Sequence, residues 1–254
     1  MKIRNRIIQY AYVYEGDWNR ISEAIQRQLI FEEKNITEKC ITILDEEYPD
    51  ALRRLRYPPW VLFYEGDLSL LKRPMMTIVG SRELCEEGKQ NTILAASILK
   101  EKYVIVSGLA KGADAVAHET ALHGGNTIAV VGCGILQRYP SCNQQLYQEI
   151  AQKGLIISEY PECVHPRKHY FPWRNRILAA LGEACIVTQA TVHSGTLLTV
   201  NEAISLSKDI WCFPYLYSDE AGKGCNRLIE QGAGILYEEA QLRVLTPKKT
   251  VWKE

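Results

Sequence analysis

Short apolar runs alternate with amphipathic segments between residues 75 and 237. The runs are rich in Val and Ile and almost continuously apolar, which is typical of strands covered on both faces. They are "MTIVG" (76–80), "YVIVS" (103–107), "TIAVVG" (127–132), "LIIS" (155–158), "ACIVT" (184–188), "DIWCF" (209–213) and "GILY" (234–237). Helical patterns separate them, namely "NTILAASILKEK", "AVAHETALH", "NQQLYQEIAQK" and "LLTVNEAISLS". This alternation predicts right-handed crossovers and an α/β fold with a doubly wound, mostly parallel sheet.

The flanks of this region follow other patterns. Residues 1–40 predict one polar amphipathic helix near 18–33 and no strand, which makes a short helical appendage. The stretch "YPDALRRLRYPPW" (48–60) predicts an extended lead-in, because its prolines interrupt regular structure. We therefore divide the chain into an abbreviated helical N-terminal segment (1–40), a main domain (41–240) and a short polar tail (241–254).

Composition limits the function classes without selecting one. The chain has 254 residues, 46% of them hydrophobic, which is enough for one sizeable core. Lys plus Arg equals Asp plus Glu at 30 each, so any basic binding site must be local. The sequence shows no apolar run of signal-peptide character and none approaching the ~18 residues that span a bilayer. We expect a cytoplasmic protein that does not enter the membrane.

The eight cysteines do not form a recognisable metal or disulfide framework. They are scattered without any CxxC pair, which favours reduced thiols used as small hydrophobic side chains. A zinc site from Cys163, His165 and His169 is disfavoured, because Pro166 interrupts their spacing and a fourth ligand is missing. We predict no metal and no cofactor.

Four glycine-bearing loops follow the predicted strands. In a parallel sheet these loops share the carboxyl edge, where helix N-termini and free amides favour anions. The alternative is that the glycines only satisfy tight strand-to-helix turns. The recurrence of Ser, Thr, Lys or Arg beside each glycine favours one shared crevice over four unrelated turns. The loops are "VGSR" (79–82), "SGLAKGAD" (107–114), "VGCG" (131–134) and "HSGT" (193–196).

The segment "PRKHYFPWRNR" (166–176) overhangs the same edge, because it follows the strand 155–158. Pro172 suits the first position of a helix, which places Arg174 and Arg176 in the first turn, where cations oppose the helix dipole. Ion pairs with Glu159 and Glu162 are one explanation for these cations. A bound anion is the other, and the neighbouring aromatic rings favour it.

Those rings, Tyr170, Phe171 and Trp173, stand among four cations and no acid. Single-stranded nucleic acid is bound by this combination, because cations hold the phosphates and ring faces stack on the bases. Packing against the sheet could still occupy one or two of the rings. The segment therefore predicts a binding site for single-stranded DNA.

Sequence signatures of P-loop nucleotide triphosphatases, NAD-binding proteins and serine hydrolases are missing. The sequence contains no GxxxxGK[ST], no GxGxxG followed by the expected acid, and no GxSxG. Asp114 and His118 share a helix face, yet a capping Asp with a partly buried His is favoured over a catalytic relay. We predict a protein that is not an enzyme and has no catalytic residue.

Eight motifs in register resemble the DprA/Smf family of DNA-processing proteins over residues 41–237. They are "IVGSR", "VSGLAKGADAVAHETAL", "TIAVVGCG", "YP" (139–140), "SEYP", "HYFPWRNRILAAL", "HSGTLLTVNEA" and "GCNRLIEQGA". The resemblance implies an extended Rossmann-like domain that binds single-stranded DNA without hydrolysing it. It further implies that the protein protects incoming single strands during natural transformation of competent cells and loads RecA onto them for homologous recombination. The family resemblance also implies a homodimer.

The same motifs carry the family's DNA-contacting positions onto this chain. These are Ser81, Arg82, Gly108, Lys111, Gly132, Lys168, Phe171, Arg174, Asn175, Arg176, Ser194 and Gly195. The chain departs from the family pattern in its abbreviated N-terminal region, in the missing C-terminal winged helix, and after "WCFP", where "YLYSDEAGKG" replaces a Gly-rich turn. We expect a different groove rim there.

The rival function is a nucleotide-binding sensor or a phosphoribohydrolase-like enzyme on a similar fold. Such enzymes carry a PGGxGTxxE motif whose glutamate performs the chemistry. Here Gly195 and Thr196 are followed by Thr199 at the corresponding position, and the nearest acid is Glu202. The carboxylate is out of place, which disfavours the enzyme.

Overall fold

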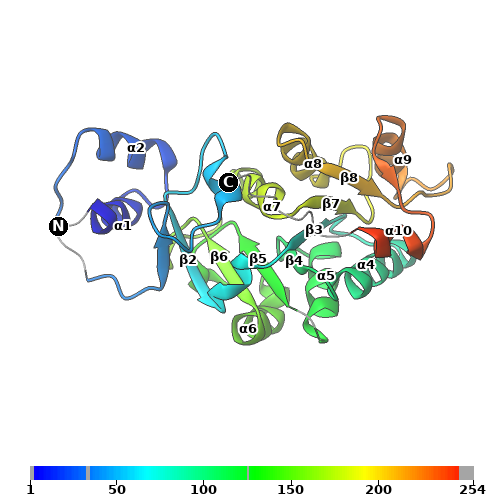
Figure 1. The fold of residues 1–254 in the computed structure, drawn as a ribbon, viewed down its shortest axis with the longest axis horizontal. Coiled ribbons are helices and arrows are strands. Elements are labelled where there is room, and N and C mark those ends of the chain that lie inside the picture. Colours follow the sequence, from blue (N-terminus) through cyan, green and yellow to red (C-terminus); the bar gives the residue numbers. More distant parts are fainter. Residues whose placement is uncertain (1–2, 33–34, 125, 246–254) are drawn as a thin grey trace, which may run out of the picture.

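A nine-stranded sheet with helices on both faces forms the centre of the computed structural model, which describes residues 3–32, 35–124 and 126–245 (Figure 1). The strand order is β1-β2-β6-β5-β4-β3-β7-β8-β9. The strands are β1 (Cys40–Thr42), β2 (Val61–Gly66), β3 (Met75–Val79), β4 (Val104–Ser107), β5 (Thr127–Val131), β6 (Leu155–Ser158), β7 (Ala184–Val187), β8 (Asp209–Cys212) and β9 (Gly234–Ile235).

The predicted doubly wound sheet is confirmed. Strands β3 to β6 run outward on one side of the sheet and β7 to β9 on the other, all parallel. The strand order therefore reverses between β3 and β7, where Ile78 pairs with Ile186. Crossovers that start on either side of this point place their helices on opposite faces.

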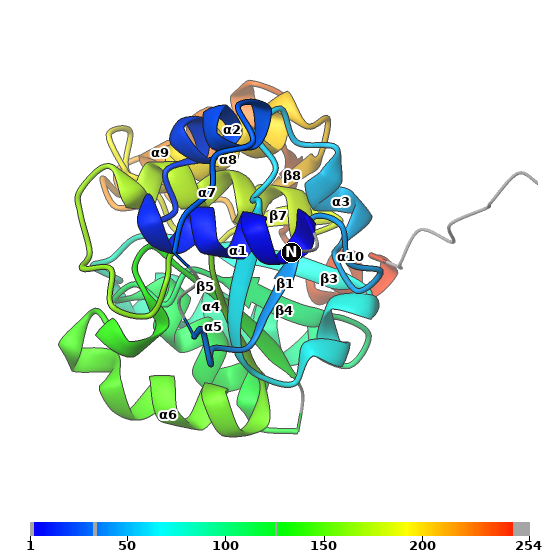
Figure 2. The same cartoon turned by 90° about the vertical axis from the view of Figure 1, so that its left-hand side faces the viewer.

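The helices cover the two faces accordingly. Figure 2 shows α4, α5 and α6 on one face and α7 and α8 on the other, and contacts between α4 and α5, α5 and α6, and α7 and α8 agree. The helices are α1 (Ile3–Val13), α2 (Trp18–Gln26), α3 (Asp50–Arg53), α4 (Glu86–Leu99), α5 (Ala113–Leu122), α6 (Gln144–Lys153), α7 (Tyr170–Leu181), α8 (Thr196–Ser205), α9 (Lys223–Glu230) and α10 (Glu239–Val244). None of the helices in the described ranges is long and apolar enough to cross a membrane.

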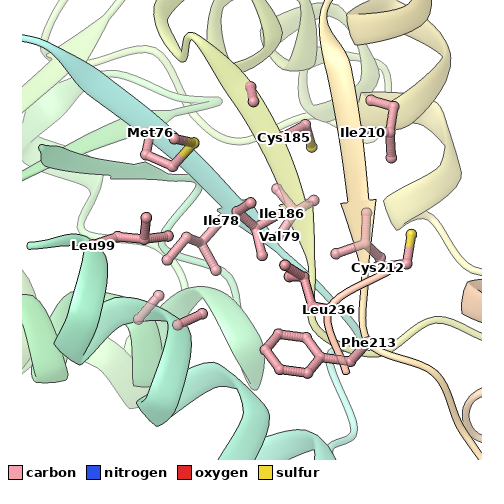
Figure 3. Close-up of a cluster of buried hydrophobic side chains, with 14 of the residues drawn as sticks. Met76, Ile78, Val79, Leu99, Cys185, Ile186, Ile210, Cys212, Phe213 and Leu236 are labelled. Carbon is pink, nitrogen blue, oxygen red and sulfur yellow. The ribbon is translucent and has the colours of Figure 1, made fainter. Parts of the chain in front are cut away.

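The core lies on both faces of the central strands. In one cluster, Ile78 of β3 and Ile186 of β7 lie near Leu99 of α4 (Figure 3). In another, Ile177 and Leu178 of α7 pack on β4, β5 and β6. Every residue of β3, β4, β5, β6 and β7 is buried, which is why their sequences read as continuous apolar runs.

The N-terminal third contains more structure than the sequence predicts. Helix α1 precedes the expected one, and its Ile7 and Ile8 pack in a cluster that includes Phe63 of β2. Strands β1 and β2 were not predicted; β2 joins the sheet antiparallel to β6, with Tyr64 opposite Ile157. Part of the expected extended lead-in forms the short helix α3.

The C-terminal boundary also differs from the expectation. Residues 241–244, assigned to the polar tail, belong to α10, whose Leu242 is buried in the main core. Residues 246–254 lie outside the described part of the chain. The division into three segments stays a prediction.

Candidate nucleic-acid interface

The loops after β3, β4 and β7 are hydrogen-bonded to one another. The amide of Ser81 donates to the carbonyl oxygen of Gln189 at 2.8 Å, and the amide of Ala113 donates to the carbonyl oxygen of Ser81 at 3.1 Å. Gly112 has φ +75°, and a Cβ there would lie 2.3 Å from the Ser81 carbonyl oxygen. Only glycine permits this approach, so the glycine is required by the junction between two loops.

The loops after β4 and β5 are joined through α7. The Arg174 guanidinium donates to the carbonyl oxygens of Gly108, at 2.8 Å, and Val130. A Cβ on Gly108 would lie 2.6 Å from that guanidinium and 2.7 Å from the Asp114 carboxylate. A Cβ on Gly132 would lie 3.0 Å from the Phe171 ring. These glycines form a floor against which side chains of other elements pack.

Helix α7 begins two residues earlier than the sequence predicts. It starts at Tyr170, so Pro172 occupies the third helical position instead of the first. The first four amides of a helix have no intrahelical partner, so a proline here removes no hydrogen bond. Arg174 is consequently the fifth residue of the helix, beyond the first turn.

Arg174 is buried beneath the loops, where it faces the buried Asp114. The Asp114 carboxylate also accepts from the amide of Ala110 at 3.2 Å. Burial raises the pKa of Asp114, although the Arg174 charge opposes this shift. Burial likewise lowers the pKa of Arg174, with Asp114 opposing the shift and Arg82 adding to it. Arg174 thus supports the glycine floor of the loops, and Arg82 lies close enough to lower the pKa of Arg174.

Arg176 has the buried ion pair that the sequence offered as one explanation. Its guanidinium lies 2.6 Å from the Glu159 carboxylate, and the two side chains are 6% and 4% exposed. It also donates to the carbonyl oxygens of Tyr57 and Trp173 and stacks 4.2 Å from the Trp173 ring centroid. Asn175 is buried as well. The burial of these residues favours a supporting role over direct contact with a ligand.

Other predicted residues face the solvent. Arg82, Lys111 and Lys168 are exposed, and none of them has a salt bridge with any described residue. Phe171 is half-buried, and its ring centroid lies 5.5 Å from that of Tyr139, which is 47% exposed. Sequence reasoning did not assign Tyr139, although the "YP" motif contains it. Three cations without ion-pair partners therefore accompany two accessible rings.

The loop after β7 is more accessible than the glycine floor. The amide and the hydroxyl of Thr196 lie 3.2 Å and 2.9 Å from the Ser194 hydroxyl, which holds the loop at the start of α8. Gly195 is exposed, and a Cβ there would meet no atom within 4 Å. Nothing in the packing of this loop therefore requires glycine at position 195.

The residues weighed for catalysis are not brought together. The ring of His118 contacts Thr127, with 2.7 Å between Nδ1 and Oγ1, whereas Asp114 faces Arg174. Burial lowers the pKa of His118 to about 3, so the ring is neutral. Glu202 follows Thr196 by six residues within α8, about 9 Å along the helix axis. Across the described ranges, no cluster of His, Cys, Asp or Glu could hold a metal ion.

The fold is that of a Rossmann-like protein, and its candidate binding residues gather at the carboxyl edge of the sheet. The sequence pattern of the DNA recombination-mediator protein A family matches residues 39–245, and the chain belongs to this family. It is therefore a recombination mediator of the DprA/Smf type, not an enzyme, as the sequence predicts.

Comparison with individual relatives agrees with this family assignment. The chain is 41% identical over 196 residues to the DNA processing protein DprA of Streptococcus pneumoniae, covering 77% of this chain and 70% of the relative. It is 36% identical over 214 residues to DprA of Bacillus subtilis, covering 83% and 72%. Against the protein Smf of Synechocystis it is 38% identical and spans 56% of that protein.

Two solved structures share the fold. The X-ray structure of DprA from S. pneumoniae matches with a TM-score of 0.79 and 33% identity, covering 94% of this chain and 92% of that one. DNA processing protein A from Helicobacter pylori, whose structure concerns its single-stranded DNA binding mode, matches with a TM-score of 0.74 and 35% identity, covering 82% and 95%.

Proposed function

We propose that the protein binds single-stranded DNA along the carboxyl edge of its sheet, with little preference for base sequence. The observation that carries the proposal is the set of three exposed cations on three different loops at the carboxyl edge of the sheet, the edge that also carries the paired Phe171 and Tyr139 rings. The cations suit phosphates and the rings suit bases. The binding mode studied for the H. pylori relative supports the same ligand class.

The buried part of the site supports this arrangement from below. Gly108 and Gly132 are buried, and the room left by their missing side chains is occupied by Arg174 and Asp114 at Gly108 and by the Phe171 ring at Gly132. These glycines therefore set the positions of the side chains that pack on them. Arg174 adds a positive charge beneath Gly108 without reaching the solvent. Duplex DNA hides its base faces, so stacking on Phe171 requires single strands.

Fluorescence anisotropy with labelled oligonucleotides of equal length, single-stranded and duplex, tests the proposal. We expect clearly tighter binding of the single strand and an affinity that falls with salt. Three phosphate contacts at ~0.7 each give a slope of about 2 in log affinity against log salt concentration. Equal affinity for the two forms at moderate salt contradicts the proposal.

Substitutions separate the phosphate contacts from the stacking contact. Lys168→Ala should weaken binding to every oligonucleotide and lower the salt slope by ~0.7, and Arg82→Ala should do the same. Phe171→Ala should weaken binding by ~1–3 kcal/mol without changing the slope. The control is Lys153→Ala, an exposed cation at the end of α6, on the opposite edge of the sheet. If Lys168→Ala leaves the affinity unchanged, as the Lys153→Ala control should, then Lys168 does not contact the DNA.

We further propose that a cytoplasmic homodimer protects the strand and delivers it to RecA recombinase. This rests on the family's resemblance and on membership in a family of recombination mediators. Light scattering measures the dimer, and the rate of RecA filament formation on strands coated with single-strand-binding protein measures delivery. A monomer at micromolar concentration without any acceleration of RecA leaves only the DNA-binding proposal.

A further inference from the structure

The segment between β8 and α9 displays two large hydrophobic side chains to the solvent. Tyr217 is 90% exposed and its neighbour Leu216 is 73% exposed. They lie in the "YLYSDEAGKG" stretch (215–224), which follows β8 and runs into α9. An aromatic ring this exposed has both faces available for a ligand.

The segment that carries these side chains is firmly held. The Tyr215 hydroxyl donates to the carbonyl oxygen of Thr188 at 2.5 Å, and Asn226 bonds both the amide and the carbonyl of Tyr215, at 3.0 Å and 2.9 Å. The amide of Asp219 closes a turn on the carbonyl oxygen of Leu216 at 2.9 Å. The Tyr217 ring therefore projects from a braced turn, which reduces the entropy lost when a ligand stacks on it.

This turn continues the edge that holds the proposed DNA site. Strand β8 is parallel to β7, with Val187 opposite Cys212, so the segment after β8 leaves from the carboxyl edge. The amide of Gly224 donates to the carbonyl oxygen of Ala190 at 2.7 Å, which ties the start of α9 to the loop after β7. Figure 1 shows the orange loop between β8 and α9 extending outward from the sheet. Four strand spacings separate β5, beside Phe171, from β8, or about 19 Å.

We propose that Tyr217, with Leu216 beside it, is a second base-stacking site for the same single strand. This inference rests on the proposed DNA binding and extends its footprint from Phe171 across the edge of the sheet. The contribution is one of stacking, because the next cation along the chain, Lys223, is paired with Glu220. Affinity gained at Tyr217 should therefore depend little on salt.

A second copy of the chain is the competing occupant, and the surroundings disfavour it. A stable interface buries about 800 Å² on each partner. The turn itself, two apolar side chains followed by Ser218, Asp219 and Glu220, supplies only a small part of that area, so an interface would also need Ile235 and Tyr237 of the neighbouring chain segment. A single base needs no more than one accessible ring face.

An oligonucleotide length series tests the inference. Wild-type affinity should rise with lengths from about 4 to about 16 nucleotides, and contact with Tyr217 should add a step of about 5- to 150-fold. Tyr217→Ala should remove this step and leave the affinity for the shortest bound oligonucleotide unchanged. Tyr217→Phe should keep the step because it keeps the ring. The control is Ile204→Ala, which alters another exposed hydrophobic side chain near the C-terminal end of α8.

The outcomes separate this inference from the proposed function. Loss of short-oligonucleotide binding in Phe171→Ala, together with loss of the length step in Tyr217→Ala, supports both. A wild-type protein without the step, or a Tyr217→Ala variant that keeps it, overturns the inference and leaves the DNA-binding proposal intact. Light scattering checks whether Tyr217→Ala dissociates a dimer. If the step is lost together with the dimer, the ring contacts a second copy of the chain, which also overturns the inference. No binding at any length rejects both.

Discussion

Replacing Arg176 by methionine distinguishes a supporting residue from a DNA contact. Met preserves much of the side-chain volume but leaves the Glu159 carboxylate buried, 4% exposed, without its partner. The second oxygen of that carboxylate, Oε2, already has no hydrogen-bond partner among the described residues. Removing one member of a buried pair costs about 3–5 kcal/mol. At 2–4 °C per kcal/mol for a chain of this size, Tm should fall by about 6–20 °C.

The double variant Arg176→Met, Glu159→Gln provides the internal control. It removes both charges, so much of the lost stability should return, and the coupling between the two substitutions should be large. Thermal unfolding followed by circular dichroism measures Tm, and anisotropy titrations well below Tm measure DNA affinity. Affinity per folded molecule should stay close to that of the wild type. A variant with unchanged Tm and lost DNA affinity refutes the reasoning and makes Arg176 a direct contact.

Three further outcomes follow from the packing. Gly112→Ala should lose about 1–3 kcal/mol of stability in urea unfolding, because its positive φ and the nearby carbonyl leave no room, whereas Gly195→Ala should be near neutral. Burial lowers the pKa of His118 to about 3 in the folded protein, so between pH ~6.5 and 3 the unfolded chain binds a proton at His118 that the folded protein does not. The free energy of unfolding therefore falls as pH drops below ~6.5. At pH 5 this loss should be about 2 kcal/mol relative to pH 7, and a His118→Gln variant that keeps the full pH dependence contradicts it. Incubation with nucleoside phosphates should release neither base nor phosphate, and turnover abolished by Glu202→Ala contradicts that expectation.

The parallel part of the sheet could be predicted from the sequence because its signal is local. The predicted runs at 76–80, 103–107 and 127–132 coincide with β3, β4 and β5 to within one residue, since burial on both faces demands apolar residues throughout. Strand β2 could not be found in this way. It pairs with β6, whose residues come 89 to 95 positions later, and a single apolar run beside two prolines does not reveal that partner.

The candidate site could be predicted only in outline. The sequence brings four glycine-bearing loops and a basic aromatic segment to one edge, and the structure joins the loops after β3, β4 and β7 by hydrogen bonds. The sequence could not distinguish exposed cations from buried ones. Arg174 and Arg176 are two residues apart, about 200° around a helix, so no amphipathic pattern predicts that both are buried. Both are buried because α7 is covered on opposite sides, by the sheet at Val130 and by the lead-in at Tyr57.

The antiparallel attachment of β2 to β6 also constrains the order in which the chain can fold during synthesis. Residues 61–66 leave the ribosome long before their partner at 155–158, and β3 waits still longer for β7 at 184–187. Contacts over such sequence separations form slowly, because a long loop must close first. A nascent chain stopped before β6 could pair β2 only with β1, which would leave the other hydrogen-bonding edge of β2 open to other chains. Completion of β6 is therefore the step after which the N-terminal third can fold onto the sheet.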